Sequence, residues 1–155
     1  EVFAVSSRGV RAFPVEDTAA ITIRFRHGAV GTVFLSDCVP SMSAFEATTG
    51  ENPLIPHDFG NCHVFYGTAA SLRFPQLKKL FYADPAQGNW HTPITEQVVQ
   101  VSSGDDAYVK EFRHFAHVIR GEEAARCSGE DARTTLAVTI AVHQSGEKGQ
   151  PVRLA

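Results

Sequence analysis

Residues 43–75 read SAFEATTGENPLIPHDFGNCHVFYGTAASLRFP and carry the densest local signals in the chain. Two apolar, strand-like runs at residues 44–48 and 62–66 flank a connection formed by residues 49–61. Polar side chains on a long loop between strands favour a binding site, although the same residue types also fill ordinary surface loops. This connection holds Glu51, Asn52, His57 and Asp58 beside two prolines.

Upstream of this stretch, the sequence predicts an antiparallel hairpin. Residues 19–26 alternate apolar Ile21, Ile23 and Phe25 with more polar neighbours, which is the period of a strand with one buried face. His27-Gly28 fits a two-residue turn in which glycine supplies the positive φ. This turn would pair residue 25 with 30 and residue 21 with 34.

The second strand of that hairpin is apolar on its other side as well, at Ala29, Gly31, Val33 and Leu35. A sheet with two apolar faces needs a cover on each. Further strands are expected at residues 78–82 and 98–102, giving one sheet of six or more largely antiparallel strands.

Two helices are expected after Gly104. Residues 105–120 place their apolar side chains on one side of a helix that ends at Gly121, with basic residues opposite. Residues 130–146 follow Ser128, a candidate N-cap with Asp131 three residues later. This second helix has two apolar stripes, so we expect it to be covered on both sides. The stripes are Ala132, Leu136 and Ile140, and Val138, Ala141 and Val142.

These patterns predict one α+β domain over residues 1–155, with an open-faced, mainly antiparallel sheet and both main helices on one face. The chain begins Glu1-Val2-Phe3 without a methionine, already in a strand-like run, so it reads as an excised domain.

Composition narrows the function classes. The chain of 155 residues has 43% hydrophobic and 20% charged residues and a net charge of −3, which fits a soluble globular domain and predicts neither nucleic-acid nor membrane binding. We expect a cytoplasmic protein. Cys38, Cys62 and Cys127 are an odd number without a CxxC pair, which favours reduced, mostly buried thiols.

Several short motifs occur in a recognisable order along nearly the whole chain. They are residues 15–20 (VEDTAA), the hairpin at 27–29, the loop at 50–52 (GEN), residues 67–72 (GTAASL), His114-Phe115 with residues 118–121 (VIRG), residues 128–131 (SGED) and residues 149–152 (GQPV). In this order the chain resembles the C-terminal domain of the NAD(P)-dependent oxidoreductases typified by glucose-fructose oxidoreductase and inositol dehydrogenase.

The resemblance implies that two domains share the function, one binding the cofactor and the other contributing to substrate binding. NAD or NADP would be bound by an N-terminal Rossmann domain absent from this chain, and the glycines here form no GxGxxG turn. The chain itself would bind part of a sugar or polyol substrate, contact its own Rossmann domain and form the oligomer interface. The family's Asp/His motif has no match here, and Glu147-Lys148-Gly149 lacks the proline of its Glu-Lys-Pro motif, so no catalytic residue is assigned.

Four residues are our substrate-binding candidates: His57, Asp58, Trp90 and His91. A lone tryptophan in a loop either stacks on a sugar-like ligand or packs on the edge of the sheet. Adjacent side chains in an extended loop point different ways, which disfavours an acid/base pair at His57-Asp58. His114 and His117 have helical spacing but no Cys, Asp or Glu to complete a metal site, so a solvated basic face is expected.

Other functions remain open at this stage. A stand-alone binding or dimerisation module is the alternative outside enzymology, and an independent hydrolase or metalloenzyme is the alternative within it. Self-association is expected through an apolar sheet face carrying Val33, Leu35, Val64 and Tyr66.

Overall fold

The computed structural model describes residues 1–101, 104 and 106–154. The contacts divide the chain into two units, one made of Glu1–Pro40 with Gly121–Ala155 and the other of Ser41–Arg120. The single-domain interpretation of the sequence stays a prediction.

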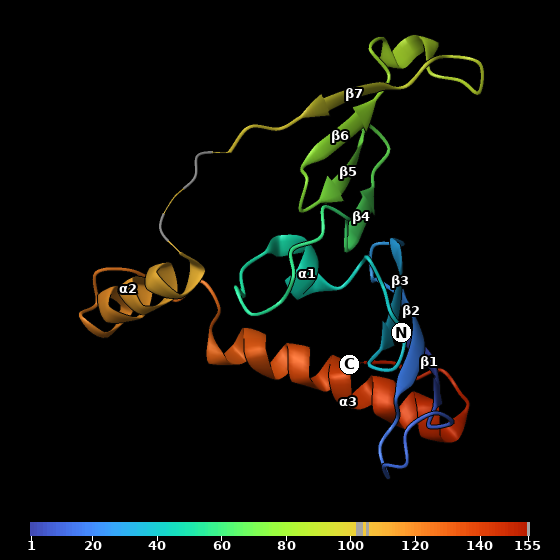
Figure 1. Cartoon of the computed structure of the whole chain (residues 1–155), viewed down its shortest axis with the longest axis vertical. Helices are drawn as coiled ribbons and strands as arrows, with labels where there is room; N and C mark the ends of the chain where they lie inside the picture. The colour runs from blue at the N-terminus through green and yellow to red at the C-terminus, as the bar shows by residue number, and fades with distance from the viewer. Residues whose placement is uncertain (102–103, 105, 155) are drawn as a thin grey trace. The chain divides into compact units, whose positions relative to one another are not determined.

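The first unit is a three-stranded antiparallel sheet with one long helix (Figure 1). Its strands lie in the order β1 (Val2–Ser7), β2 (Thr18–Arg24) and β3 (Val30–Ser36). Helix α3 (Gly129–Lys148) lies against β1.

The predicted register of the β2–β3 hairpin is wrong by one residue. Ile21 pairs with Val33, not with Phe34. Phe25 and Ala29 close the turn through the bond from Phe25 N to Ala29 O, 2.8 Å, so three residues rather than two connect the strands. Gly28, at φ 88°, takes the left-handed position of such a loop. Successive side chains of a strand point to opposite faces of the sheet. The one-residue shift in register therefore places Val33 and Leu35 on the same face as Ile21.

The core of the first unit lies between that face and α3. Val2, Ala4 and Ile21 are buried on the sheet, with Ala141 buried on the helix. Val138 and Val142 of α3 are packed against this cluster, which is the second of the two predicted stripes. The first stripe points elsewhere, since Leu136 and Ile140 are 58% and 48% exposed. One side of α3 is therefore covered within the unit and the other is not.

Two polar residues are buried in the first unit. Ser145, with no exposed surface, accepts a hydrogen bond from the Ala4 backbone N–H (3.0 Å) and donates one to the Gln150 carbonyl (2.6 Å). Asp17 is 5% exposed, and its Oδ2 accepts bonds from the backbone N–H groups of Val10 and Arg11. The Arg11 and Val10 amides hold the pKa of the Asp17 carboxyl below its ordinary value.

The N-terminal end of α3 has the predicted cap. The Ser128 hydroxyl accepts from the Asp131 N–H, and the Asp131 carboxylate accepts from the Ser128 N–H, completing a capping box. Gly149 at φ 62° ends the helix, so Glu147 and Lys148 form its last turn rather than a separate surface turn. The helix predicted at residues 130–146 is confirmed with slightly longer bounds.

The second unit is a four-stranded antiparallel sheet with its own short elements. Strands β4 (His63–Tyr66), β5 (Ser71–Phe74), β6 (Lys78–Phe81) and β7 (Thr95–Val98) lie in chain order. Helix α1 (Phe45–Thr49) precedes them, the 3₁₀ turn η1 (Pro85–Gln87) joins β6 to β7, and α2 (Ala107–Ile119) follows.

Three local predictions need correction here. Residues 44–48 are not a strand: most of them lie in α1, where the Thr48 and Thr49 hydroxyls bond back to the Phe45 carbonyl and Gly50 at φ 66° ends the turn. The strand expected at residues 98–102 is β7, three residues earlier, and residue 102 lies outside the described residues. The strands form two sheets instead of one.

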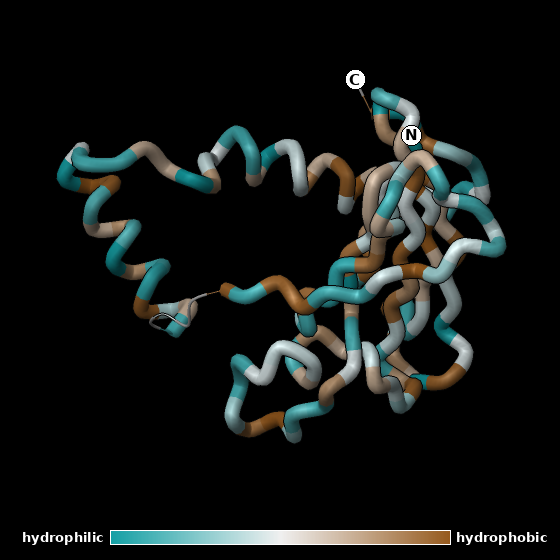
Figure 2. The backbone as a smooth tube through the Cα atoms, turned by 90° about the horizontal axis from the view of Figure 1, so that it is seen from above, coloured by the Kyte–Doolittle hydropathy of each residue, from teal (hydrophilic) through white to brown (hydrophobic). Residues whose placement is uncertain are grey.

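Helix α2 confirms the prediction for residues 105–120 within the described part of that range. Asp106 caps it by accepting from the Tyr108 N–H (2.9 Å), and Gly121 follows at φ 73°. Hydrophobic and hydrophilic positions alternate along this helix (Figure 2). Tyr108, Phe112 and Phe115 are 63%, 71% and 60% exposed, so its apolar side is uncovered within the unit.

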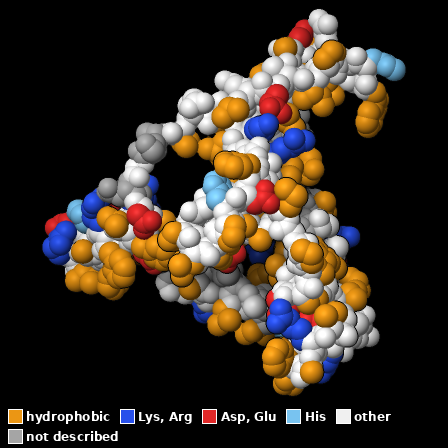
Figure 3. All heavy atoms as spheres, viewed as in Figure 1, with side chains coloured by type: hydrophobic (Ala, Val, Ile, Leu, Met, Phe, Trp, Pro, Cys, Tyr) orange, Lys and Arg blue, Asp and Glu red, His pale blue; other side chains and the backbone are white. Residues whose placement is uncertain are grey.

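The predicted fold class is confirmed: the chain is α+β, with antiparallel sheets and two main helices. Many hydrophobic side chains, orange in Figure 3, lie at the surface of the chain. The three cysteines are free as expected, with Cys38 and Cys62 half-buried, but Cys127 is exposed, which corrects the expectation of mostly buried thiols. In the described part of the chain, no helix is long and apolar enough to cross a membrane.

Candidate functional site

The first pair of candidate residues, His57 and Asp58, lies on the loop between α1 and β4. The His57 side chain is exposed, and its Nε2 lies 3.3 Å from the Thr48 carbonyl oxygen at the end of α1. The Asp58 N–H donates to the Ala47 carbonyl at 2.8 Å. The loop therefore folds back onto α1, which holds His57 through its side chain and Asp58 through its backbone.

Two glycines allow this close packing. A Cβ at Gly50 would lie 3.2 Å from the His57 ring, and Gly50 already needs its positive φ to end α1. A Cβ at Gly60 would collide with the Met42 carbonyl oxygen. The Asp58 Oδ1 accepts from the Gly60 N–H at 3.2 Å, which orients the carboxylate. The loop therefore presents an exposed imidazole and, separately, a half-buried carboxylate oriented by a backbone hydrogen bond.

The second pair, Trp90 and His91, lies on the connection between η1 and β7. Trp90 is fully exposed, so it does not pack on the edge of the sheet, the more ordinary of its two sequence interpretations. His91 is also exposed, and its N–H donates to the Asn89 side chain at 2.8 Å.

The strand register separates these two pairs. The loop with His57 enters β4 at His63, which is at one end of the sheet. The connection with Trp90 leaves β6 at Phe81 and enters β7 at Thr95, at the end where β4 stops. Strands of four residues separate the two ends by roughly 10 Å. The fold therefore does not bring the four candidates together at one end of the sheet.

Aromatic neighbours of the His57 loop were missed by the sequence analysis. The Phe59 ring lies 4.7 Å from the His57 ring and is 77% exposed, so it offers an apolar face next to the imidazole. His63 packs among Phe45 and Phe74, and the Cys62 Sγ lies 3.2 Å from its Nδ1. Phe59 directly follows Asp58 in the sequence, but only the fold of the loop shows that its ring meets His57.

The described residues do not fit a nicotinamide dinucleotide. Such a cofactor places its pyrophosphate at a helix N-terminus within a parallel βαβ unit. Here every paired strand of the described sheets is antiparallel. The carboxylates of Asp131 and Asp106 lie at the N-terminal ends of α3 and α2, where they would repel a phosphate. Among the described residues, no group of three His, Cys, Asp or Glu side chains is placed to hold a metal.

A three-stranded antiparallel sheet backed by the long capped helix α3, and a separate four-stranded antiparallel sheet, define an α+β chain. The family model described as "Oxidoreductase family, C-terminal alpha/beta domain" matches residues 2–154. The chain belongs to that family, which confirms the resemblance found in the sequence.

A solved structure agrees on the fold. The structure of "putative oxidoreductase yvaA from Bacillus subtilis" superposes with a TM-score of 0.67 at 13% sequence identity, covering 99% of this chain and 45% of that one. At this identity the likeness shows the fold alone. This chain thus spans less than half the length of its structural relative. A search of curated proteins finds no match.

Proposed function

We propose that this chain is the substrate-binding and oligomerisation domain of an NAD(P)-dependent oxidoreductase. The observation that carries the proposal is the family match over residues 2–154 together with a preformed loop that presents His57 and Asp58. The family generally binds NAD(P) in its N-terminal domain, and NAD or NADP would supply the hydride chemistry there.

The His57 loop suits a sugar or polyol. An imidazole both donates and accepts hydrogen bonds, and an ionised carboxylate accepts them from hydroxyl groups. Gly60 binds Oδ1 of Asp58, and the described residues provide no partner for Oδ2. The exposed Phe59 ring beside His57 can pack on the C–H groups of the same ligand. We therefore propose that His57 and Asp58 form the principal part of the substrate-binding surface, called here the substrate wall.

Trp90 and His91 remain substrate candidates at the other end of the sheet. The exposure of Trp90 fits stacking on a sugar ring. Because the register places this pair away from His57, its contribution is tested separately.

Self-association through the uncovered face of the β1–β2–β3 sheet is the other part of the proposal. That face carries Phe3, Val5, Val30 and Phe34, which are 36–78% exposed. An apolar sheet face of this kind is rarely left open by a monomer. The corrected register excludes Val33 and Leu35 from this interface, because they lie on the α3 side.

The test uses the whole protein that contains this chain. NAD and NADP are each offered with a panel of sugars and polyols, and the change in nicotinamide absorbance is followed. We expect His57→Ala and Asp58→Asn each to lower kcat/KM by about 10-fold to 100-fold, the value of a hydrogen bond to a charged group. Asp58→Asn keeps an oxygen to accept from Gly60, so it tests the charge.

His27→Ala is the matched control, because it removes an exposed loop histidine from the other unit. Trp90→Ala and His91→Ala are measured in parallel. Wild-type kinetics in both His57 and Asp58 variants would overturn the assignment of the substrate wall. Complete absence of nicotinamide turnover, with a protein that still self-associates, would favour the stand-alone dimerisation module.

A further inference from the structure

The connection that carries Trp90 is held by four local hydrogen bonds. Asp84 accepts from the Ala86 N–H and from the Gln87 side chain, at 3.0 Å and 2.9 Å. The Gln87 carbonyl accepts from the side chains of Asn89 and Thr92, at 2.9 Å and 2.6 Å. These bonds fix the loop on both sides of Trp90 while leaving its side chain fully exposed.

This loop presents a fully exposed indole that can contact another surface. The hydrogen bonds already formed in the free chain reduce the conformational entropy that the loop loses on binding. Tryptophan is among the residues that most often contribute large binding energies at protein interfaces.

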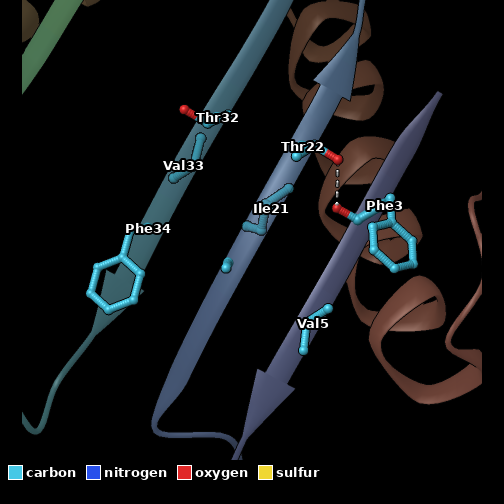
Figure 4. Close-up of a pocket in the computed structure, with 8 residues that line it drawn as sticks. Phe3, Val5, Ile21, Thr22, Thr32, Val33 and Phe34 are labelled. Carbon is cyan, nitrogen blue, oxygen red and sulfur yellow. Dashed lines mark hydrogen bonds between the residues drawn. The ribbon is translucent and has the colours of Figure 1, made fainter.

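The uncovered face of the three-stranded sheet has a hollow of matching character (Figure 4). Two cross-strand rows form it, Phe3–Thr22–Thr32 and Val5–Ala20–Phe34. Its volume is about 280 Å³, and the small Ala20 side chain at the centre of the second row leaves the depression open. Figure 4 shows α3 behind the sheet, so the hollow faces away from the helix.

Polar groups in the hollow also match an indole. The Thr22 hydroxyl already donates a hydrogen bond to the Phe3 carbonyl oxygen, at 3.4 Å. The Thr32 hydroxyl makes no hydrogen bond with the described residues, so it is available as an acceptor. An indole Nε1–H is a donor only, and a buried one needs an acceptor.

We propose that Trp90 of one copy of this chain inserts into the hollow of a second copy. The inference rests on the self-association proposed above and names its anchor. One tryptophan buries about 150–250 Å². One such contact, counted on both partners, buries roughly 300–500 Å², about a quarter of a standard interface of roughly 1,600 Å². Exposed neighbours on the same face, such as Val30, supply further area.

The single tryptophan of the chain makes this contact directly observable. The 155-residue chain is diluted from high to low micromolar concentration while mass is measured by light scattering and tryptophan emission is recorded. We expect emission at shorter wavelength, and protection from a soluble quencher, in the associated form only.

Two variants test the contact from its two sides. Trp90→Ala removes the anchor, and Ala20→Leu fills the exposed centre of the hollow. Each should raise the dimer dissociation constant about 30-fold, as expected for an interface residue of high energy. The double variant should be no weaker than either single one, because both remove the same contact. As controls outside the contact, Phe13→Ala removes another exposed aromatic ring and Ala124→Leu enlarges another exposed alanine, and both should leave association unchanged.

Dimers with unchanged Trp90 emission, or with wild-type affinity in both variants, would overturn this inference while leaving self-association in place. A monomer at every concentration would overturn both. Emission that responds to added sugar but not to protein concentration would also overturn it, in favour of ligand stacking.

Discussion

The two units of this chain bury their apolar side chains to different extents. The first unit has a core, in which Val2, Ala4 and Ile21 of the sheet meet Ala141 of α3. In the described residues of the second unit, the one side chain classed as buried is Thr48, and its large aromatic residues are mostly exposed. A sheet packed on a helix is stable by itself, whereas a bare four-stranded sheet depends on what covers it. The second unit is therefore where a partner surface is most needed.

The largest expected effect is a core truncation that contrasts the two sheets. Ile21→Ala removes a buried side chain of the first unit and should lower the free energy of unfolding by about 2–5 kcal/mol. Leu72→Ala removes a half-buried side chain of β5 and should cost about 1 kcal/mol, because less apolar area returns to water. Urea unfolding followed by circular dichroism measures both. Equal losses would mean that the second unit has a core of its own.

A smaller effect is expected from the buried hydroxyls. Ser145→Ala leaves the Ala4 N–H and the Gln150 carbonyl without their partner and should cost about 1–3 kcal/mol. Thr48→Val removes the hydroxyl that bonds to the Phe45 carbonyl three residues away and keeps the buried methyl group, so we expect about 1 kcal/mol or less. Thermal unfolding of the two variants compares them directly. A Thr48→Val loss as large as that of Ser145→Ala would contradict the distinction between long-range and local bonds.

The two helix-ending glycines give a matched pair. Gly50→Ala and Gly149→Ala each place a side chain at positive φ, with a strain of about 1–2 kcal/mol. The Gly149 Cβ would have nothing within 4 Å, whereas the Gly50 Cβ would press on the His57 ring at 3.2 Å. Only Gly50→Ala should therefore shift the His57 imidazole resonances by NMR. Unshifted resonances would show that the loop does not hold His57 against α1.

The smallest expected effect on stability appears only at acidic pH. Because the pKa of Asp17 is lowered on folding, its contribution is present above the unfolded value, near 3.8, and is lost as the pH falls through the folded value. Asp17→Asn should flatten the acid limb of the stability profile of the first unit. Acid titrations followed by circular dichroism test this, and superimposable acid limbs for the two proteins would contradict it.

Several features were predictable from the sequence because their causes are local. The Ser128–Asp131 capping box and the glycine that follows each main helix determine where these helices begin and end. The order of short motifs identified the family, which the match over residues 2–154 confirms.

Other predictions failed where two local signals compete. Residues 44–48 have a strand-like pattern, yet threonine hydroxyls and Gly50 stabilise a helical turn there. His27-Gly28 fits a two-residue turn, yet the chain uses three residues and moves Val33 to the other face. A shift of one residue leaves the alternation pattern unchanged, so the sequence alone cannot distinguish the two registers.

The sequence by itself determined the fold class, the two main helices and the residue types offered to a ligand, because propensity, capping and periodicity act over a few residues. Only the tertiary structure decided which of those residues are neighbours. The strand register places His57 and Trp90 at opposite ends of one sheet, and it exposes Phe34 while turning Val33 toward α3. Both outcomes depend on hydrogen bonds between strands, whose pairing is fixed by contacts that no single segment contains.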